Sequence, residues 1–278
     1  MADDVGQAQG ARGEAAEARR RGVGRAGVLS LPLLLFLIIP LVALLLRAAP
    51  ADVGATLLEP EVRQAIALSA RTTLTTAALA VVFGTPVAYL LARRRFPGWR
   101  LVDTLVELPT VLPPAVAGVA LLVAFGRRGL IGQWLAAAGL GVSFTTAAVV
   151  MAQLFIAAPL FVRAAMLGFA GIATELEQAA EIDGASPWQR FRYVTLPLAY
   201  PALLSGAVVA WARALGEFGA TIIFAGNFPG RTQTMPLAIY IGFELDLDAA
   251  LVLSVLMIVA SFATLALVKW GLHRDTEQ

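Results

Sequence analysis

Long apolar runs constrain this chain more than any other feature. A helix needs about 20 predominantly apolar residues to cross roughly 30 Å of hydrocarbon, and six runs approach or exceed that length. Because lipid offers no hydrogen-bond partner, a spanning segment must satisfy its own backbone groups, and a single helix does so. The sequence therefore predicts an all-α, polytopic membrane protein with six transmembrane helices at 28–46, 65–92, 102–125, 145–169, 198–225 and 249–271.

The charge content agrees with this fold class and sets the outer boundaries. Only 14% of the residues are charged, against about a quarter in soluble domains. Residues 1–27 are polar and cannot bury a core, so we expect a disordered tail, followed by one membrane domain at 28–271 and a short tail at 272–278. A cleaved signal peptide is the alternative for 28–46. We favour a retained anchor, since signal peptides carry only ~7–15 apolar residues.

Basic residues are distributed unevenly between the two sides, which predicts the orientation. If the N-terminal tail is cytoplasmic, both termini and the 174–197 loop lie inside, in a bacterial or archaeal cell membrane. The outer segments then hold only Arg47, Arg63, Arg127, Arg128 and Arg231. The inner segments hold many more: Arg12, Arg19, Arg20, Arg21, Arg25, Arg93, Arg94, Arg95, Arg100, Arg190, Arg192, Lys269 and Arg274.

Several kinds of chemistry are excluded by composition. The chain has no cysteine and one histidine, His273, so we expect no thiol nucleophile, no zinc motif and no metal site. Its one lysine, Lys269, follows Val268, whereas a nucleotide-binding P-loop needs Gly-Lys-Ser/Thr. We expect no catalytic residue and no cofactor in this chain. Any ATP that drives it must be hydrolysed by another polypeptide.

The polar stretch 177–201 stands out within an apolar chain. Thr174 and Glu177 have the spacing of a capping box, which predicts a helix start, and Gly184 suits the left-handed residue that ends that helix. Ser186, Pro187 and Gln189 predict a second helix with its own capping box. The interpretation is a rigid helix–turn–helix on the membrane surface, suited to binding a partner. An ordinary amphipathic loop is the alternative.

Two polar or proline-rich sites within the spans are candidates for a pore or gate. Pro109, Pro113 and Pro114 interrupt the third span and predict a kink, needed either for a pore or only for packing. Arg213 and Glu217 are four residues apart in the fifth span, so they can pair, either at a gate or as a structural pair. Arg163 is expected to snorkel toward the inner surface. Residues 126–144 are expected to form an outer loop with a short helix.

The 177–197 stretch resembles the cytoplasmic coupling loop of ABC importer permeases, with their pattern Glu-Ala-Ala, three residues, Gly, then a hydrophobic-x-Leu-Pro. Here Gln178 replaces the first Glu, which keeps hydrogen-bonding capacity but loses a charge. The resemblance implies a homodimer that binds two cytoplasmic P-loop ATPases, an extracytoplasmic solute-binding protein and membrane lipid, but no nucleic acid. It also implies that the ATPase contacts Glu177, Gln178, Ala179, Ala180, Asp183, Gly184 and Ala185.

The stretch 213–240 resembles the oxyanion branch of that family, whose members carry molybdate, tungstate or sulfate, and is most similar to molybdate permeases. Residues 108–114 share this likeness. An ion-coupled secondary transporter remains an alternative, with Glu107 and Glu217 as the candidate acidic groups. That class gives no reason for the 174–197 loop. A membrane enzyme is a weaker alternative, because the chain has no cysteine and no histidine within a predicted span.

Overall fold

The computed structural model describes residues 29–48, 53–93 and 96–274. The expected tail 1–27 and residues 275–278 lie outside the described residues. The chain separates into two units, one ending at Ala51 and the other starting at Asp52. In the first unit, residues 29–48 form one apolar helix, Leu29–Ala48, where the sequence predicts the first span. Its retention as an anchor stays a prediction.

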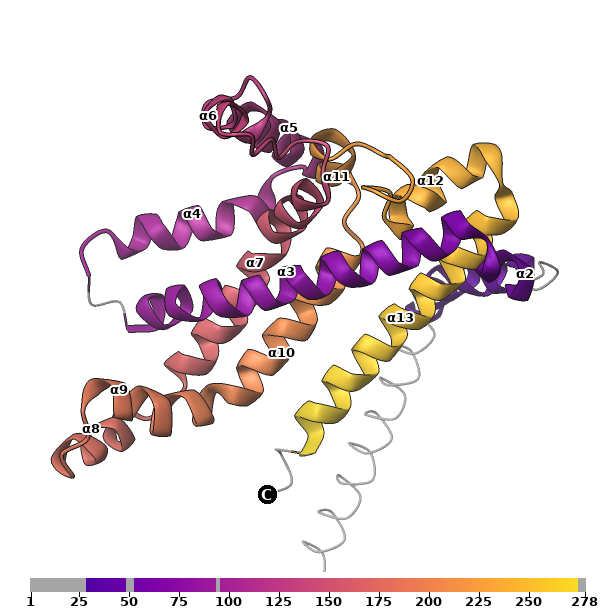
Figure 1. The fold of residues 1–278 in the computed structure, drawn as a ribbon. Coiled ribbons are helices and arrows are strands. Elements are labelled where there is room, and N and C mark those ends of the chain that lie inside the picture. The colour runs from indigo at the N-terminus through magenta and orange to yellow at the C-terminus, as the bar shows by residue number, and fades with distance from the viewer. Residues whose placement is uncertain (1–28, 49–52, 94–95, 275–278) are drawn as a thin grey trace, which may run out of the picture. The chain divides into compact units, whose positions relative to one another are not determined.

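The second unit consists of helices joined by short turns (Figure 1). No strand occurs among the residues that the structure describes. The elements are α2 (Val53–Leu58), α3 (Pro60–Arg93), α4 (Trp99–Val111), α5 (Pro114–Phe125), α6 (Gly132–Ala137), α7 (Thr146–Ala170), α8 (Thr174–Ile182), α9 (Pro187–Arg190), the π-helical turn η1 (Phe191–Thr195), α10 (Leu196–Leu215), α11 (Gly219–Phe224), α12 (Met235–Leu245) and α13 (Leu247–Arg274).

Five helices of the described chain are long and apolar enough to cross a membrane, and the bent pair α4–α5 makes a sixth if it counts as one span. On that count the six predicted spans all have a counterpart. The fifth counterpart starts earlier than expected, because α9, η1 and α10 run on as one helical segment, Pro187–Leu215. The last helix continues to Arg274, past the predicted end at 271.

The third span is broken rather than kinked. The helix direction bends by 117° between α4 and α5. A residue before proline avoids the helical region, and Leu112 and Pro113 each precede a proline and have extended backbones, with ψ of 136° and 133°. Pro109, in contrast, lies inside α4 without ending it. The adjacent pair of prolines therefore ends the helix, which a single proline does not do here.

The fifth span is shorter than predicted. The sequence predicts one helix to residue 225, but α10 ends at Leu215, and the chain turns into the short helix α11. Gly216 and Gly219 lower helix propensity at this point. Glu217 then accepts a hydrogen bond from the backbone N–H of Ala220, which stabilises the start of α11 instead of a continued α10.

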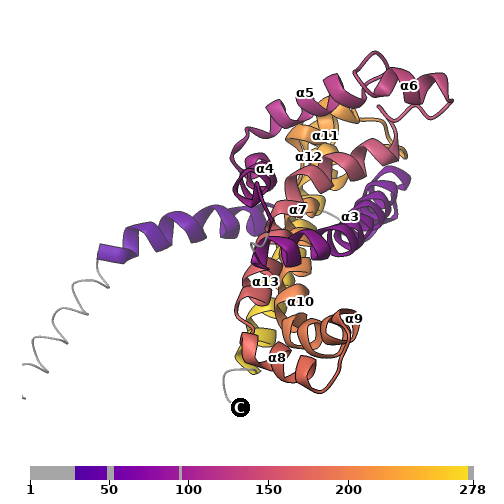
Figure 2. The same ribbon diagram turned by 90° about the vertical axis from the view of Figure 1, so that its left-hand side faces the viewer.

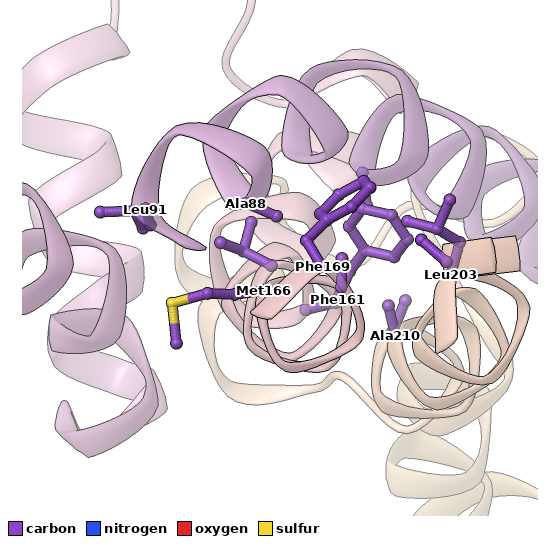
Figure 3. Packing of buried hydrophobic residues seen from close by; sticks show 13 residues of the cluster. Ala88, Leu91, Phe161, Met166, Phe169, Leu203 and Ala210 are labelled. Carbon is purple, nitrogen blue, oxygen red and sulfur yellow. The ribbon is translucent and has the colours of Figure 1, made fainter. Parts of the chain in front are cut away.

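The main core lies where α7 packs against α3 and α10 (Figure 3). Phe161 and Phe169 of α7 are fully buried there, in a cluster that also contains alanines of α3 and α10. Small residues let membrane helices approach closely. A Cβ built on Gly168 of α7 would lie 2.3 Å from the Cβ of Ala202 in α10, so this crossing requires glycine. The core holds α3, α7 and α10 together.

Smaller clusters join further helices. Ala117, Ala148 and Phe224 join α5, α7 and α11, whereas Val62, Met235 and Leu253 join α3, α12 and α13. Figures 1 and 2 show α8 and α9 at one end of α7 and α10, with α5, α6 and α11 toward the other end. The helix–turn–helix therefore stands apart from the tightly packed core.

Candidate functional site

The predicted break at Gly184 is confirmed. Gly184 has φ of +84°, in the left-handed region that favours glycine. Its N–H donates to the carbonyl of Glu181 at 3.0 Å, and the N–H of Ala185 donates to the carbonyl of Ala180 at 2.9 Å. These two bonds satisfy carbonyls at the end of α8 in the pattern of a Schellman motif. The turn is thus fixed by backbone geometry.

The second capping box is confirmed and the first is wrong. The Ser186 hydroxyl accepts from the N–H of Gln189, and the Gln189 side chain accepts from the N–H of Ser186 at 2.8 Å. Thr174, however, is the first residue of α8, whose N-cap is Ala173 without a side-chain bond. Glu177 bonds instead to Arg93 and to the Thr195 hydroxyl. The bond to Arg93 joins two charged groups and is therefore stronger than a backbone cap.

The residues predicted to contact the ATPase differ in their exposure. Gln178, Ala179, Asp183 and Gly184 are exposed, Ala180 and Ala185 are partly buried, and Glu177 is mostly buried. Large apolar side chains are also exposed on this loop, which is unusual for a polar, solvent-facing segment. We call them the coupling patch: Leu176, Ile182 and Trp188, of which Ile182 is 86% exposed.

The three prolines have different positions. Pro113 and Pro114 form the α4–α5 break. Pro109 lines a cavity of about 420 Å³ between α3, α4, α5 and α7. Every residue around this cavity is apolar or glycine, so it offers no side-chain hydrogen bond to a polar solute.

Arg163 has partners that its sequence position does not suggest. Its guanidinium lies 2.8 Å from the carboxylate of Glu107 and 3.4 Å from that of Asp103, both on α4. The expectation that Arg163 only snorkels is therefore wrong. The two acids are four residues apart on one helix face, and that spacing was the available signal. The partner was not visible in sequence because α4 and α7 are brought together only by the fold.

Arg213 and Glu217 pair as predicted, with 2.9 Å between Arg213 Nη1 and Glu217 Oε2. The Glu217 side chain is 1% exposed and lies just beyond the end of α10. Its second oxygen accepts from the N–H of Ala220 at 2.9 Å. Both oxygens are thus engaged, so the pair fixes the turn between α10 and α11. Its role at a gate stays a prediction.

Sequence reasoning missed α12 as an element. Its 11 residues are apolar but too short to span a membrane. The buried hydroxyl of Ser69 in α3 accepts from the N–H of Met235, which attaches the start of α12 to α3. Pro236 at the first turn was the available signal for a helix start.

Comparison with known proteins agrees with this geometry. Residues 84–271 match the family model "Binding-protein-dependent transport system inner membrane component". The "Molybdenum transport system permease protein ModB" of Mycobacterium tuberculosis is 43% identical over 228 residues, 82% of this chain and 86% of that protein. The "Probable transport system permease protein NifC" of Clostridium pasteurianum is 34% identical over 241 residues, 86% of this chain and 84% of that protein.

Solved structures share the fold. A bacterial ABC transporter for import of the polysaccharide alginate has a TM-score of 0.65 at 20% identity, covering 93% of this chain and 96% of that chain. The inward-facing MetNI methionine ABC transporter has a TM-score of 0.55 at 22% identity, covering 76% of this chain and 95% of that chain. With the family match, these findings show that the chain belongs to the inner membrane components of binding-protein-dependent transport systems.

Proposed function

We propose that the chain is the membrane-spanning permease subunit of an ATP-driven importer for molybdate or a related oxyanion such as tungstate or sulfate. The observation that carries the ATP-driven class is the coupling loop, a rigid, exposed helix–turn–helix with apolar side chains available to a partner. The substrate class rests on the 43% identity to a molybdenum permease over most of both chains.

The proposed assembly contains two copies of this chain, two cytoplasmic ATPases and an extracytoplasmic binding protein. The sequence printed here has no P-loop, so the chain acts as a non-enzymatic pore subunit, with ATP bound and hydrolysed by its partner. A related alginate importer has been solved in complex with a ligand-bound periplasmic protein, which supports this kind of partner. In this assembly the coupling loop and both termini are cytoplasmic, in a bacterial or archaeal cell membrane.

The proposed mechanism is alternating access. Closure of the ATPases moves the coupling loops and opens the pore outward, and reopening lets the anion pass inward. Arg163 and Arg213 are both paired with carboxylates, and the cavity beside Pro109 is apolar. Such surroundings pass an anion without retaining it, so discrimination by size and hydrogen bonding belongs to the binding protein.

The ion-coupled alternative has less support. It requires a carboxylate that exchanges its cation during each cycle. Glu107 and Glu217 each have an arginine partner already, and Glu217 is buried. Membership in a binding-protein-dependent family also favours the ATP-driven class.

The test is uptake by proteoliposomes that contain this chain with the ATPase and binding protein of its own operon. We expect radiolabelled molybdate to accumulate only with ATP and loaded binding protein, and unlabelled tungstate to compete. Uptake without ATP, or stimulation only by a binding protein loaded with sugar or amino acid, would overturn the proposal.

A further inference from the structure

A single carboxylate joins three elements at the inner end of the bundle. Glu177 of α8 pairs with Arg93, which lies 84 residues earlier in the last turn of α3. The same Glu177 oxygen accepts from the Thr195 hydroxyl of η1 at 2.7 Å. We refer to these three residues, Arg93, Glu177 and Thr195, as the clamp.

The side chains of the clamp are largely shielded from solvent, whereas the helix α8 that carries Glu177 is not. The helix α8 contains no buried residue. The side chains of Arg93 and Glu177 are nevertheless only 18% and 16% exposed, and Thr195 is buried. The other ion pair of the coupling loop, Arg190 with Glu181, lies at the surface, with Glu181 62% exposed. Shielded charges interact more strongly than exposed ones, so the clamp is the firmer attachment of α8.

Aromatic contacts extend the clamp to the other half of the loop. Tyr89, one turn before Arg93, packs edge-on against Phe169 of α7 at 5.5 Å and Phe191 of η1 at 5.2 Å between ring centroids. Phe191 in turn stacks on Trp188 of α9 at 5.8 Å. The Arg93 guanidinium lies 5.3 Å from the Tyr89 ring centroid, within cation–π range. The end of α3 thus contacts α8 directly and is linked to α9 through Phe191 of η1.

The positions of Arg93 and Glu177 at helix ends also favour their pairing. Arg93 lies in the last turn of α3 and Glu177 in the first turn of α8, where the helix dipoles favour a cation and an anion. The π-helical turn carries Thr195 at its end, with the N–H of Leu196 bonded to the carbonyl of Phe191. Such single π-turns inside longer helices occur frequently at functional sites.

The chain itself connects the coupling loop to α7 and α10, and α3 packs against those two helices in the main core. The last turn of α3 in addition contacts the loop directly through the clamp and Tyr89. Resting on the proposed function, we propose that Arg93, Glu177 and Thr195 are positioning residues that transmit the movement of the coupling loop to α3. Without the clamp, an ATPase that moves α8 still moves α7 and α10, but the last turn of α3 follows that movement less completely. ATP is then hydrolysed without full opening of the pore.

The test compares uptake per ATP hydrolysed in the reconstituted complex for Arg93→Gln, Glu177→Gln and the charge swap Arg93→Glu with Glu177→Arg. We expect each single change to lower the ratio by about fivefold or more, the low end of typical coupling between sites. The charge swap should restore much of the uptake per ATP hydrolysed. A merely structural defect lowers hydrolysis and uptake together and leaves the ratio unchanged.

The surface pair supplies the matched control. Arg190→Gln and Glu181→Gln should leave the ratio near that of the wild type. An unchanged ratio in Arg93→Gln and Glu177→Gln, or equal losses in the surface pair, would overturn the clamp. The wild-type complex tests the proposed function separately, since the ratio can be measured for whichever oxyanion it carries. A wild-type complex that does not take up molybdate therefore does not contradict the role proposed for the clamp.

Discussion

Gly184 is the residue of the coupling loop whose backbone is hardest for another side chain to adopt. A Cβ added there would meet nothing within 4 Å, so space does not restrict the position. The restriction is the φ of +84°, which costs a non-glycine residue about 1–3 kcal/mol and more when the side chain is β-branched. The residue is therefore needed for the direction of the turn rather than for packing.

We predict that Gly184→Val leaves the protein inserted but lowers ATP-dependent uptake by about tenfold, the ratio that ~1.4 kcal/mol produces. Gly98 gives the matched control, because it has φ of +82° and equally free space but precedes α4 instead of lying in the coupling loop. Gly98→Val should keep more uptake at similar protein yield. Equal losses in the two variants would show that the effect is general backbone strain.

The Arg213–Glu217 pair allows a second prediction about individual residues. Arg213→Gln leaves a carboxylate buried beside apolar helices without its cation, which should lower thermal stability in detergent by more than about 1 kcal/mol. Glu217→Gln keeps an acceptor for the N–H of Ala220 and should cost less than Glu217→Ala. The double change Arg213→Gln with Glu217→Gln should recover part of the loss. Strictly additive losses would argue against pairing.

At the scale of elements, the apolar runs predict the spans well because crossing a membrane demands length and hydrophobicity that sequence displays directly. The points at which the spans break are harder to predict from sequence. Pro113 with Pro114 ends a helix where one proline at 109 does not, and Glu217 starts α11 only because its carboxylate finds the N–H of Ala220. In the coupling loop, Gly184 and Ser186 were sufficient to predict the turn and the start of the second helix. The partners of Glu177 and Arg163 were not predictable, since they depend on which helices meet.

The coupling patch leads to a prediction about assembly. Ile182 and Trp188 are 86% and 68% exposed at the tip of the loop. We expect Ile182→Ser with Trp188→Ser to reduce co-purification of the ATPase strongly, because a docking surface loses its apolar area. Leu130→Ser with Trp134→Ser changes two similarly exposed apolar residues near α6 and should leave the ATPase bound. Loss of the ATPase from both variants would indicate misfolding.

For the whole molecule, the predicted orientation puts α6 and the coupling loop on opposite sides of the membrane. The chain contains no cysteine, so single cysteines report position without further changes. Gln178→Cys should react with an impermeant maleimide only from the cytoplasmic side, and Gln133→Cys, which is exposed on α6, only from outside. Reaction of both from the same side would refute the predicted orientation.

The proposed function requires that this chain carries an oxyanion inward only when a separate ATPase hydrolyses ATP. The most direct measurement is molybdate accumulation in proteoliposomes that contain the wild-type permease and its ATPase, with the binding protein supplied outside and ATP enclosed. Accumulation should require all three components and should stop when the enclosed ATP is replaced by a non-hydrolysable analogue. Accumulation that persists without ATP, or that follows an imposed proton or sodium gradient, would contradict it.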